Sequence, residues 1–130
     1  MKYIIMMNTM RVGHGVPEWP QKDLQAHIGF MVSLNKELRH SGELVSAEGL
    51  SFPDQAKLVQ ADKDGLPITD GVFPESKEFL AGYWIVDVDS PERAYVIAAK
   101  VSAAPGPGGR PLNMPIEVRP IMCGPPPEML

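Results

Sequence analysis

The stretch Gly82-Tyr83-Trp84-Ile85-Val86-Asp87-Val88 decides the fold of this chain. It is rich in aromatic and β-branched residues, which favour a β-strand. Side chains of a strand point alternately to its two faces, and here both alternating sets are largely apolar. We therefore expect a strand in a sheet that is covered on both faces.

A helix is predicted directly after this strand. Ser90-Pro91-Glu92 combine an N-cap residue, a proline at the first helical position and an acid in the first turn. The helix should end at Pro105, because the run Pro105-Gly106-Pro107-Gly108-Gly109 is typical of a loop. Its apolar side consists of Ala94, Ile97, Ala98 and Val101. Residues 116–122 are then expected to form the last strand.

The first part of the chain has the same order of strand, helix and strand. Tyr3 to Met7 is an unbroken apolar run, which predicts a strand buried on both faces. From Gln21 apolar residues recur at three- and four-residue steps, which predicts an amphipathic helix with a left-handed stop at Gly42. Residues 43–50 are predicted to form the next strand. The residues expected to face the core from this helix are Leu24, Ile28, Met31, Leu34 or Asn35, and Leu38.

A hairpin is predicted between the two halves. Asp64-Gly65 separates Lys57–Gln60 from Pro67–Thr69, and this pair favours a tight two-residue turn. Two β-α-β units interrupted by a hairpin predict an α+β fold, a ferredoxin-like split βαβ sandwich with helices on one face of the sheet. Because two helices cover only one side, we expect a homodimer whose sheets face each other around a cavity.

Composition limits the domain count and the kinds of partner. The 130 residues fit one domain, expected over residues 1–122, followed by a Pro-rich tail at 123–130. The net charge is −4 and the twelve basic residues form no cluster, which argues against nucleic acid and membrane surfaces as partners. No apolar run approaches the roughly 20 residues of a membrane span. We expect a cytoplasmic protein.

Cysteine and histidine usage argues against a metal or an organic cofactor. Cys123 is the single cysteine, and the three histidines have no regular spacing. The sequence has no phosphate-binding loop and no dinucleotide-binding fingerprint. We expect neither a metal nor a cofactor.

His27 and Asp70 are the candidate catalytic residues. His27 lies on the apolar seam of the first helix, and an imidazole beside a carboxylate can act as a general base near neutral pH. Asp70 or Glu48 would supply that carboxylate. The alternatives are structural: an imidazole that bonds a backbone carbonyl, and an Asp70 side chain that organises the turn before Gly71.

Five further residues are candidates for binding a substrate. Arg119 lies in the last strand, where its guanidinium needs Asp87, Glu75 or a bound anion as its partner. Tyr83 would offer a hydroxyl at the mouth of the cavity or pack as an aromatic filler. The charged turn at residues 69–78, which carries Asp70, Glu75, Lys77 and Glu78, contributes polar groups on a loop, or charges that are simply solvated. The full set is Glu48, Glu75, Lys77, Tyr83 and Arg119.

Three blocks of the sequence resemble the YCII-related family, in the branch named for an Asp-Gly-Pro-Phe motif. They are Met1–Ile5, then His27–Met31 with Ala47–Leu50, and then Thr69–Glu78 continuing through Gly82–Ser90 and Ile116–Ile121. The resemblance implies a dimeric α+β barrel of ferredoxin-like subunits. It also implies a small enzyme or a ligand-binding module, encoded in some relatives beside alternative sigma factors or fused to them.

The chain departs from the family motif in its most specific block. Val72 stands where the motif has proline, and Pro74 follows Phe73 where a small residue is usual. The rigid residue of the turn has therefore moved by two positions, which changes the expected geometry of the loop.

Two functions fit these residues. In the first, His27 with Asp70 or Glu48 moves a proton on a small molecule while Arg119 or Lys77 holds negative charge, as in a lyase, isomerase or hydrolase. In the second, the loop at residues 70–78 is a contact surface of a non-catalytic module that binds a ligand or a protein such as a sigma factor. A cavity holding His27 and a carboxylate would favour the first function, and an exposed apolar patch beside the loop would favour the second.

Overall fold

The computed structural model describes residues 1–10, 19–51, 53–71 and 78–122. Glu75, Lys77 and the predicted tail at 123–130 lie outside this range. The elements in chain order are β1 (Lys2–Met10), α1 (Gln21–His40), β2 (Leu44–Gly49), β3 (Lys57–Ala61), β4 (Pro67–Gly71), β5 (Glu78–Asp87), α2 (Pro91–Ser102) and β6 (Glu117–Pro120), with single 3₁₀ turns at Pro53–Gln55 and Pro107–Gly109.

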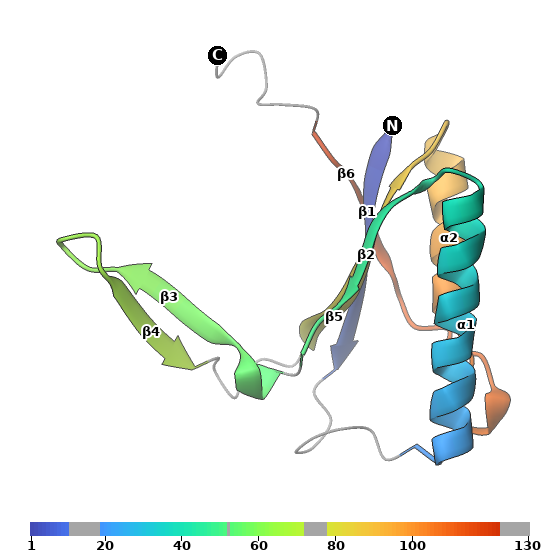
Figure 1. Ribbon diagram of the computed structural model, residues 1–130, viewed down its shortest axis with the longest axis horizontal. Helices are drawn as coiled ribbons and strands as arrows, with labels where there is room; N and C mark the ends of the chain where they lie inside the picture. Colours follow the sequence, from blue (N-terminus) through green and yellow to red (C-terminus); the bar gives the residue numbers. More distant parts are fainter. Residues whose placement is uncertain (11–18, 52, 72–77, 123–130) are drawn as a thin grey trace.

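Four strands form one antiparallel sheet in the order β2-β5-β1-β6. Figure 1 shows α1 and α2 together on one side of this sheet. The remaining strands, β3 and β4, pair with each other as a separate hairpin. The predicted α+β fold, a ferredoxin-like split βαβ sandwich with an inserted hairpin, is confirmed.

The predicted stop of the first helix and the predicted start of the second are also confirmed. Gly42 has a φ of 80°, the left-handed conformation that glycine adopts without steric cost after a helix. The Ser90 hydroxyl accepts a hydrogen bond from the Arg93 backbone N–H at 3.2 Å and caps α2. The helix α2 ends at Ser102, three residues before the predicted stop at Pro105.

The core is one apolar layer between the sheet and the two helices. β1 and β5 form its floor because they are the central strands, and alternate side chains of each point toward the helices. Its fully buried members include Ile5 and Val86 from the sheet, Leu38 from α1, and Ile97 and Val101 from α2.

The opposite face of the sheet, called here the open face, has no helix over it in the described part of the chain (Figure 1). The strand register places Ile4 beside Ile85 and Arg119, and Met6 beside Tyr83. The four apolar side chains among these are half-buried, whereas Ile5 on the core face is fully buried. The prediction that β1 is buried on both faces is therefore wrong within one chain.

The buried seam of α1 also differs from the prediction. Leu38 is buried as expected, but Leu24 and Ile28 are 42% and 52% exposed. The N-terminal half of α1 turns Asp23 inward instead, and its carboxylate accepts a hydrogen bond from the Gly108 N–H at 3.1 Å. The loop after α2 lies against this part of the helix, so polar contacts decide which face is buried there.

The hairpin connection is longer than predicted. It spans Asp62 to Leu66, and the Asp62 carboxylate accepts hydrogen bonds from the N–H groups of Asp64 at 2.8 Å and Leu66 at 2.9 Å. Gly65 has a φ of 81° within this connection. The prediction of a two-residue turn is wrong because the Asp62 side chain organises a wider turn around Asp64-Gly65.

An ion pair fastens α2 to the start of β2. The Arg93 guanidinium donates two hydrogen bonds of 2.8 Å to the two carboxylate oxygens of Glu43. The Ser41 hydroxyl donates a third, also of 2.8 Å. The hydrogen bond from Arg93, with a further contribution from Ser41, outweighs the effect of burial and lowers the pKa of Glu43 from its ordinary value of 4.5 to about 2.

We predict that Arg93→Met lowers the free energy of unfolding by about 1–2 kcal/mol at neutral pH, a value reduced for partial solvent exposure of the pair. Because the Glu43 pKa is lower in the folded chain, the stabilisation is complete above about pH 5 and is lost as the pH falls toward 2. Urea unfolding at a series of pH values should show a steeper loss of stability in the wild type than in the variant. Equal slopes between pH 5 and 2 would contradict this role of the ion pair.

Candidate functional site

A cleft of about 180 Å³ lies between α1 and the sheet, beside the edge strand β2. One wall comes from His27, Met31 and Asn35, which follow each other at four-residue steps along one side of α1. Three of the predicted site residues, His27, Glu48 and Tyr83, line this cleft together. Its other lining residues are Met7, Ala47, Gly49, Ala81, Gly82 and Trp84.

The His27 ring is held in one orientation by two contacts. Its Nδ1 lies 3.0 Å from the carbonyl oxygen of Pro105, and the Trp19 ring meets it edge to face with 5.3 Å between centroids. A carbonyl oxygen only accepts hydrogen bonds, so Nδ1 carries a proton and donates it. In the neutral ring Nε2 is then unprotonated and able to accept a proton.

The carbonyl contact was the structural alternative for His27, and the structure contains it. The same contact fixes the tautomer that a general base needs. The structural and catalytic interpretations of His27 are therefore compatible.

Glu48 and Tyr83 face each other across β2 and β5. The Glu48 side chain is exposed, and its carboxylate has neither a hydrogen bond nor an ion pair to any residue that the structure describes. This carboxylate is available to a bound molecule. Trp84 turns its indole toward Asn35 on α1, so the neighbouring Tyr83 and its strand partner Glu48 point to the open face, on the other side of the sheet from the His27 imidazole.

Gly82 sets the spacing of the strands beneath the cleft. It pairs with Gly49, and a Cβ added at Gly82 would lie 3.0 Å from the Glu48 carbonyl oxygen. A Cβ added at Gly49 would meet no atom within 4 Å. Gly82, unlike Gly49, is therefore needed for the close approach of β2 and β5.

Asp70 lies elsewhere in the chain. It belongs to β4 on the projecting hairpin, and it is not among the residues that line the cleft (Figure 1). Its carboxylate accepts a hydrogen bond of 2.8 Å from the N–H of Gly71, the residue that follows it. One copy of the chain does not bring Asp70 to His27.

Arg119 is exposed on the open face and does not line the cleft either. Its expected partner Asp87 instead accepts a hydrogen bond of 2.9 Å from the amino group of Met1, which lowers the pKa of Asp87 below its usual value. The predicted pair between Arg119 and Asp87 does not form. The Arg119 guanidinium has no ion pair within the described ranges.

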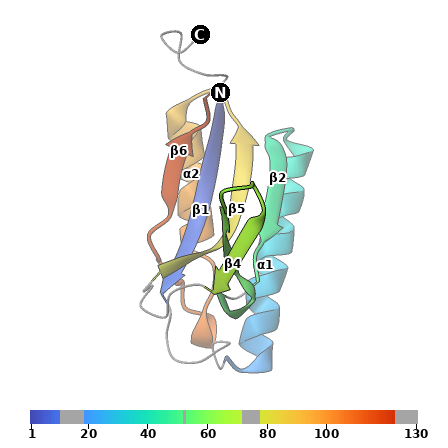
Figure 2. The ribbon, with the colours of Figure 1, turned by 90° about the vertical axis from the view of Figure 1, so that its left-hand side faces the viewer.

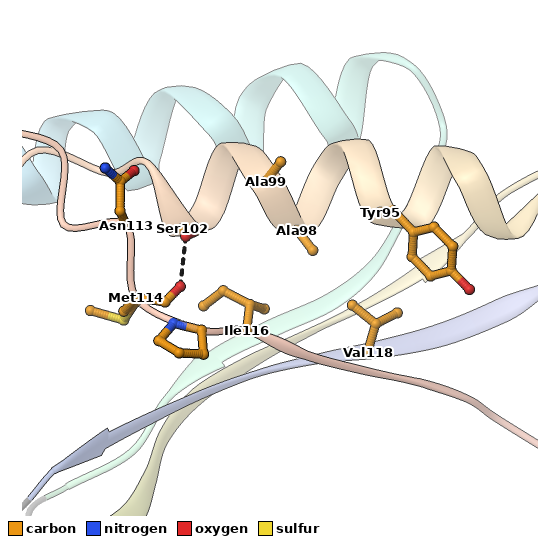
Figure 3. Close-up of a pocket in the computed structure, with 9 residues that line it drawn as sticks. Tyr95, Ala98, Ala99, Ser102, Asn113, Met114, Ile116 and Val118 are labelled. Atoms are coloured by element: carbon orange, nitrogen blue, oxygen red, sulfur yellow. Dashed lines mark hydrogen bonds between the residues drawn. The ribbon is translucent and has the colours of Figure 1, made fainter.

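A larger and shallower cavity of about 410 Å³ lies between α2 and the segment that leads into β6. Figure 3 shows Tyr95 toward one end, Asn113 toward the other and the apolar side chains of Ile116 and Val118 along one wall. The Ser102 hydroxyl donates a hydrogen bond of 2.6 Å to the Met114 carbonyl. This lining has no carboxylate and no imidazole, so the smaller cleft is better equipped for proton transfer.

Two groups at the cleft were missed by the sequence analysis. The Asn35 side chain accepts a hydrogen bond of 2.8 Å from the Trp84 indole N–H and so fixes the back of the cleft. Its spacing of eight residues from His27 on one helix would have indicated it. Trp19 precedes the helix, and no periodic signal connects it to the His27 ring.

Two further findings concern metals and membranes. Among the described residues, no group of three or more His, Cys, Asp or Glu side chains is arranged to hold a metal ion. None of the helices that the structure describes has the length and apolar character needed to cross a membrane.

Comparison with known proteins identifies a family. Residues 1–106 match the family described as the YCII-related domain. The matched range includes all the residues that line the cleft. No curated protein matches the chain.

We predict that Gly82→Ala lowers the free energy of unfolding by about 1–3 kcal/mol, because the added methyl group presses on the Glu48 carbonyl and must push β2 away from β5. Gly49→Ala is the matched control, since its methyl group enters open space. Chemical denaturation of both variants compares them directly. A Gly49→Ala variant destabilised as much as Gly82→Ala would show that steric contact with Glu48 is not the cause.

Proposed function

We propose a proton-transfer function for this chain, which belongs to the YCII-related family. The proposed protein is an enzyme that needs no cofactor and acts on a small molecule bound in the His27 cleft. The observation that carries the proposal is the hydrogen bond between His27 and the Pro105 carbonyl. It fixes the tautomer, so that Nε2 is the nitrogen that would accept the proton.

His27 carries the chemistry in this proposal. Its Nε2 would accept a proton from the substrate and return it to another atom, as isomerase, lyase and hydrolase reactions can require. Glu48 and Tyr83 point to the open face and are proposed contacts of a part of the ligand that reaches that face. The apolar side chains of Met7, Met31 and Trp84 favour a substrate with an apolar part.

A homodimer is part of the proposal. Proteins of the YCII-related family are typically dimeric α+β barrels. The volume of the cleft in one copy is below the roughly 300–1,000 Å³ of ordinary ligand sites. A second sheet facing the open face would cover Tyr83 and Ile85. Arg119, on the same face, would then be available to a negatively charged group of a molecule bound between the two sheets.

Three finer assignments rest on the sequence. We propose the branch with the Asp-Gly-Pro-Phe motif because Asp70, Gly71 and Phe73 match it. We propose one domain over residues 1–122, and a cytoplasmic location because the chain has a single cysteine. Glu75 and Lys77 remain proposed ligand contacts on the strength of their place in the charged turn.

A second candidate function is a non-catalytic module that binds another protein, such as a sigma factor. One observation favours it: the hairpin beside Asp70 exposes apolar side chains, among them Ile68 at 52% and Leu58 at 45%. Exposed apolar groups gathered on one surface mark interaction sites. Under this function the cleft would bind no substrate that exchanges protons.

We predict that the protein catalyses deuterium exchange from D₂O into small carbon acids, followed by proton NMR across a panel of enolisable ketones and keto acids. General-base catalysis typically contributes about 100–10,000-fold, so His27→Asn should lower the exchange rate by at least about 100-fold. The asparagine amide can still donate to the Pro105 carbonyl, but it has no group that replaces Nε2 as a base.

Thermal unfolding of His27→Asn close to that of the wild type provides the control for folding. Glu48→Gln should retain at least part of the exchange activity, since His27 performs the proton transfer. A panel on which wild type and His27→Asn give the same rates would contradict the proposed function.

A further inference from the structure

The hairpin β3–β4 forms an arm, residues 57–71, that stands away from the rest of the described chain. All ten residues of its two strands are exposed. Figures 1 and 2 show the arm on the side of the open face, opposite the two helices. An isolated two-stranded hairpin is marginally stable in water. The arm therefore needs a surface to pack against.

One face of the arm is suited to such packing. The register pairs Leu58 with Asp70 and Gln60 with Ile68, so these side chains share one face. The backbone bond from the Asp62 N–H to the Leu66 carbonyl continues the ladder and brings Leu66 to the same face. Three large apolar side chains thus lie together on what is called here the Leu58 face. The other face consists of Lys57, Val59, Ala61, Pro67, Thr69 and Gly71.

The position of the arm fits a second copy of the chain as the occupant. The exposed arm and the half-buried apolar groups of the open face lie on the same side of the molecule, so one copy of the chain could cover both at once.

Charge on the two surfaces is complementary. Asp70 on the Leu58 face and Arg119 on the open face are both exposed, and neither forms an ion pair with a described residue of its own copy. An apolar arm that carries a carboxylate matches a face that carries apolar groups and a guanidinium.

We propose that the arm of each chain packs its Leu58 face against a second copy of the chain, across the open face of the sheet. The proposal rests on the homodimer of the proposed function and adds a specific contact to it. The arm holds the two copies together, and Asp70 contacts the second copy instead of the His27 of its own chain.

A mixed dimer tests the contact directly. Equal amounts of ¹³C-labelled and unlabelled chains are combined, and isotope-filtered NMR detects contacts between copies only. The methyl groups of Leu58 and Ile68 should show cross-peaks to protons of the unlabelled copy. Arm methyl groups without any such cross-peak in a sample that is dimeric would overturn the proposal.

Variants on the two faces of the arm supply an independent test. Leu58→Ser combined with Ile68→Ser should raise the dissociation constant of the dimer about 10–100-fold, measured by sedimentation equilibrium. Val59→Ser is the matched control, because Val59 is 60% exposed on the other face, and its effect should stay below about threefold.

The outcomes separate the two proposals. A dimer that the double variant leaves as tight as the wild type overturns the role of the arm and leaves the proton-transfer function standing. A wild-type protein that catalyses no deuterium exchange, while its arm makes contacts between copies, overturns the catalytic proposal and leaves the role of the arm standing.

Discussion

Both helices pack on one side of a four-stranded antiparallel sheet, and this one-sided cover constrains the rest of the structure. In each half of the chain a helix joins two strands that are parallel to each other and separated by one strand. Such crossovers are right-handed, so the two helices fall on the same face. The apolar groups of the other face, such as Ile4 and Ile85, then have no cover within the described chain.

The cleft forms where the apolar core gives way to polar contacts. The C-terminal half of α1 buries Leu34 and Leu38 against the sheet. Its N-terminal half instead binds the loop after α2, through Asp23 to Gly108 and through His27 to Pro105. The helix is therefore held near its start by hydrogen bonds, and this leaves space beside β2 with an oriented imidazole in it.

Much of the fold could be predicted from the sequence because its signals are local. The cap at Ser90, the stop at Gly42 and the composition of β5 each act within a few residues. The orientation of α1 near its start could not be predicted, because the apolar seam continues through Leu24 and Ile28 while the structure buries Asp23 there. Contacts with a loop more than 75 positions away in sequence determine which side is buried.

The candidate site could be predicted only in part, because some of its contacts depend on residues far apart in sequence. His27, Glu48 and Tyr83 line one cleft because the sheet register and one helix bring these residues together, but the alternation of side chains along β5 turns Tyr83, and with it Glu48, to the open face. The position of Asp70 depends on how the hairpin leaves the sheet, and no pattern within the hairpin specifies that angle. The partner of Asp87 is the amino group of Met1, a group that a search for charged side chains does not consider.

The central claim is that a second copy of the chain covers the open face of the sheet. Light scattering coupled to size-exclusion chromatography, at micromolar concentration, measures this most directly. The account predicts a particle of twice the chain mass of 14.2 kDa. A particle with the mass of one chain would contradict it.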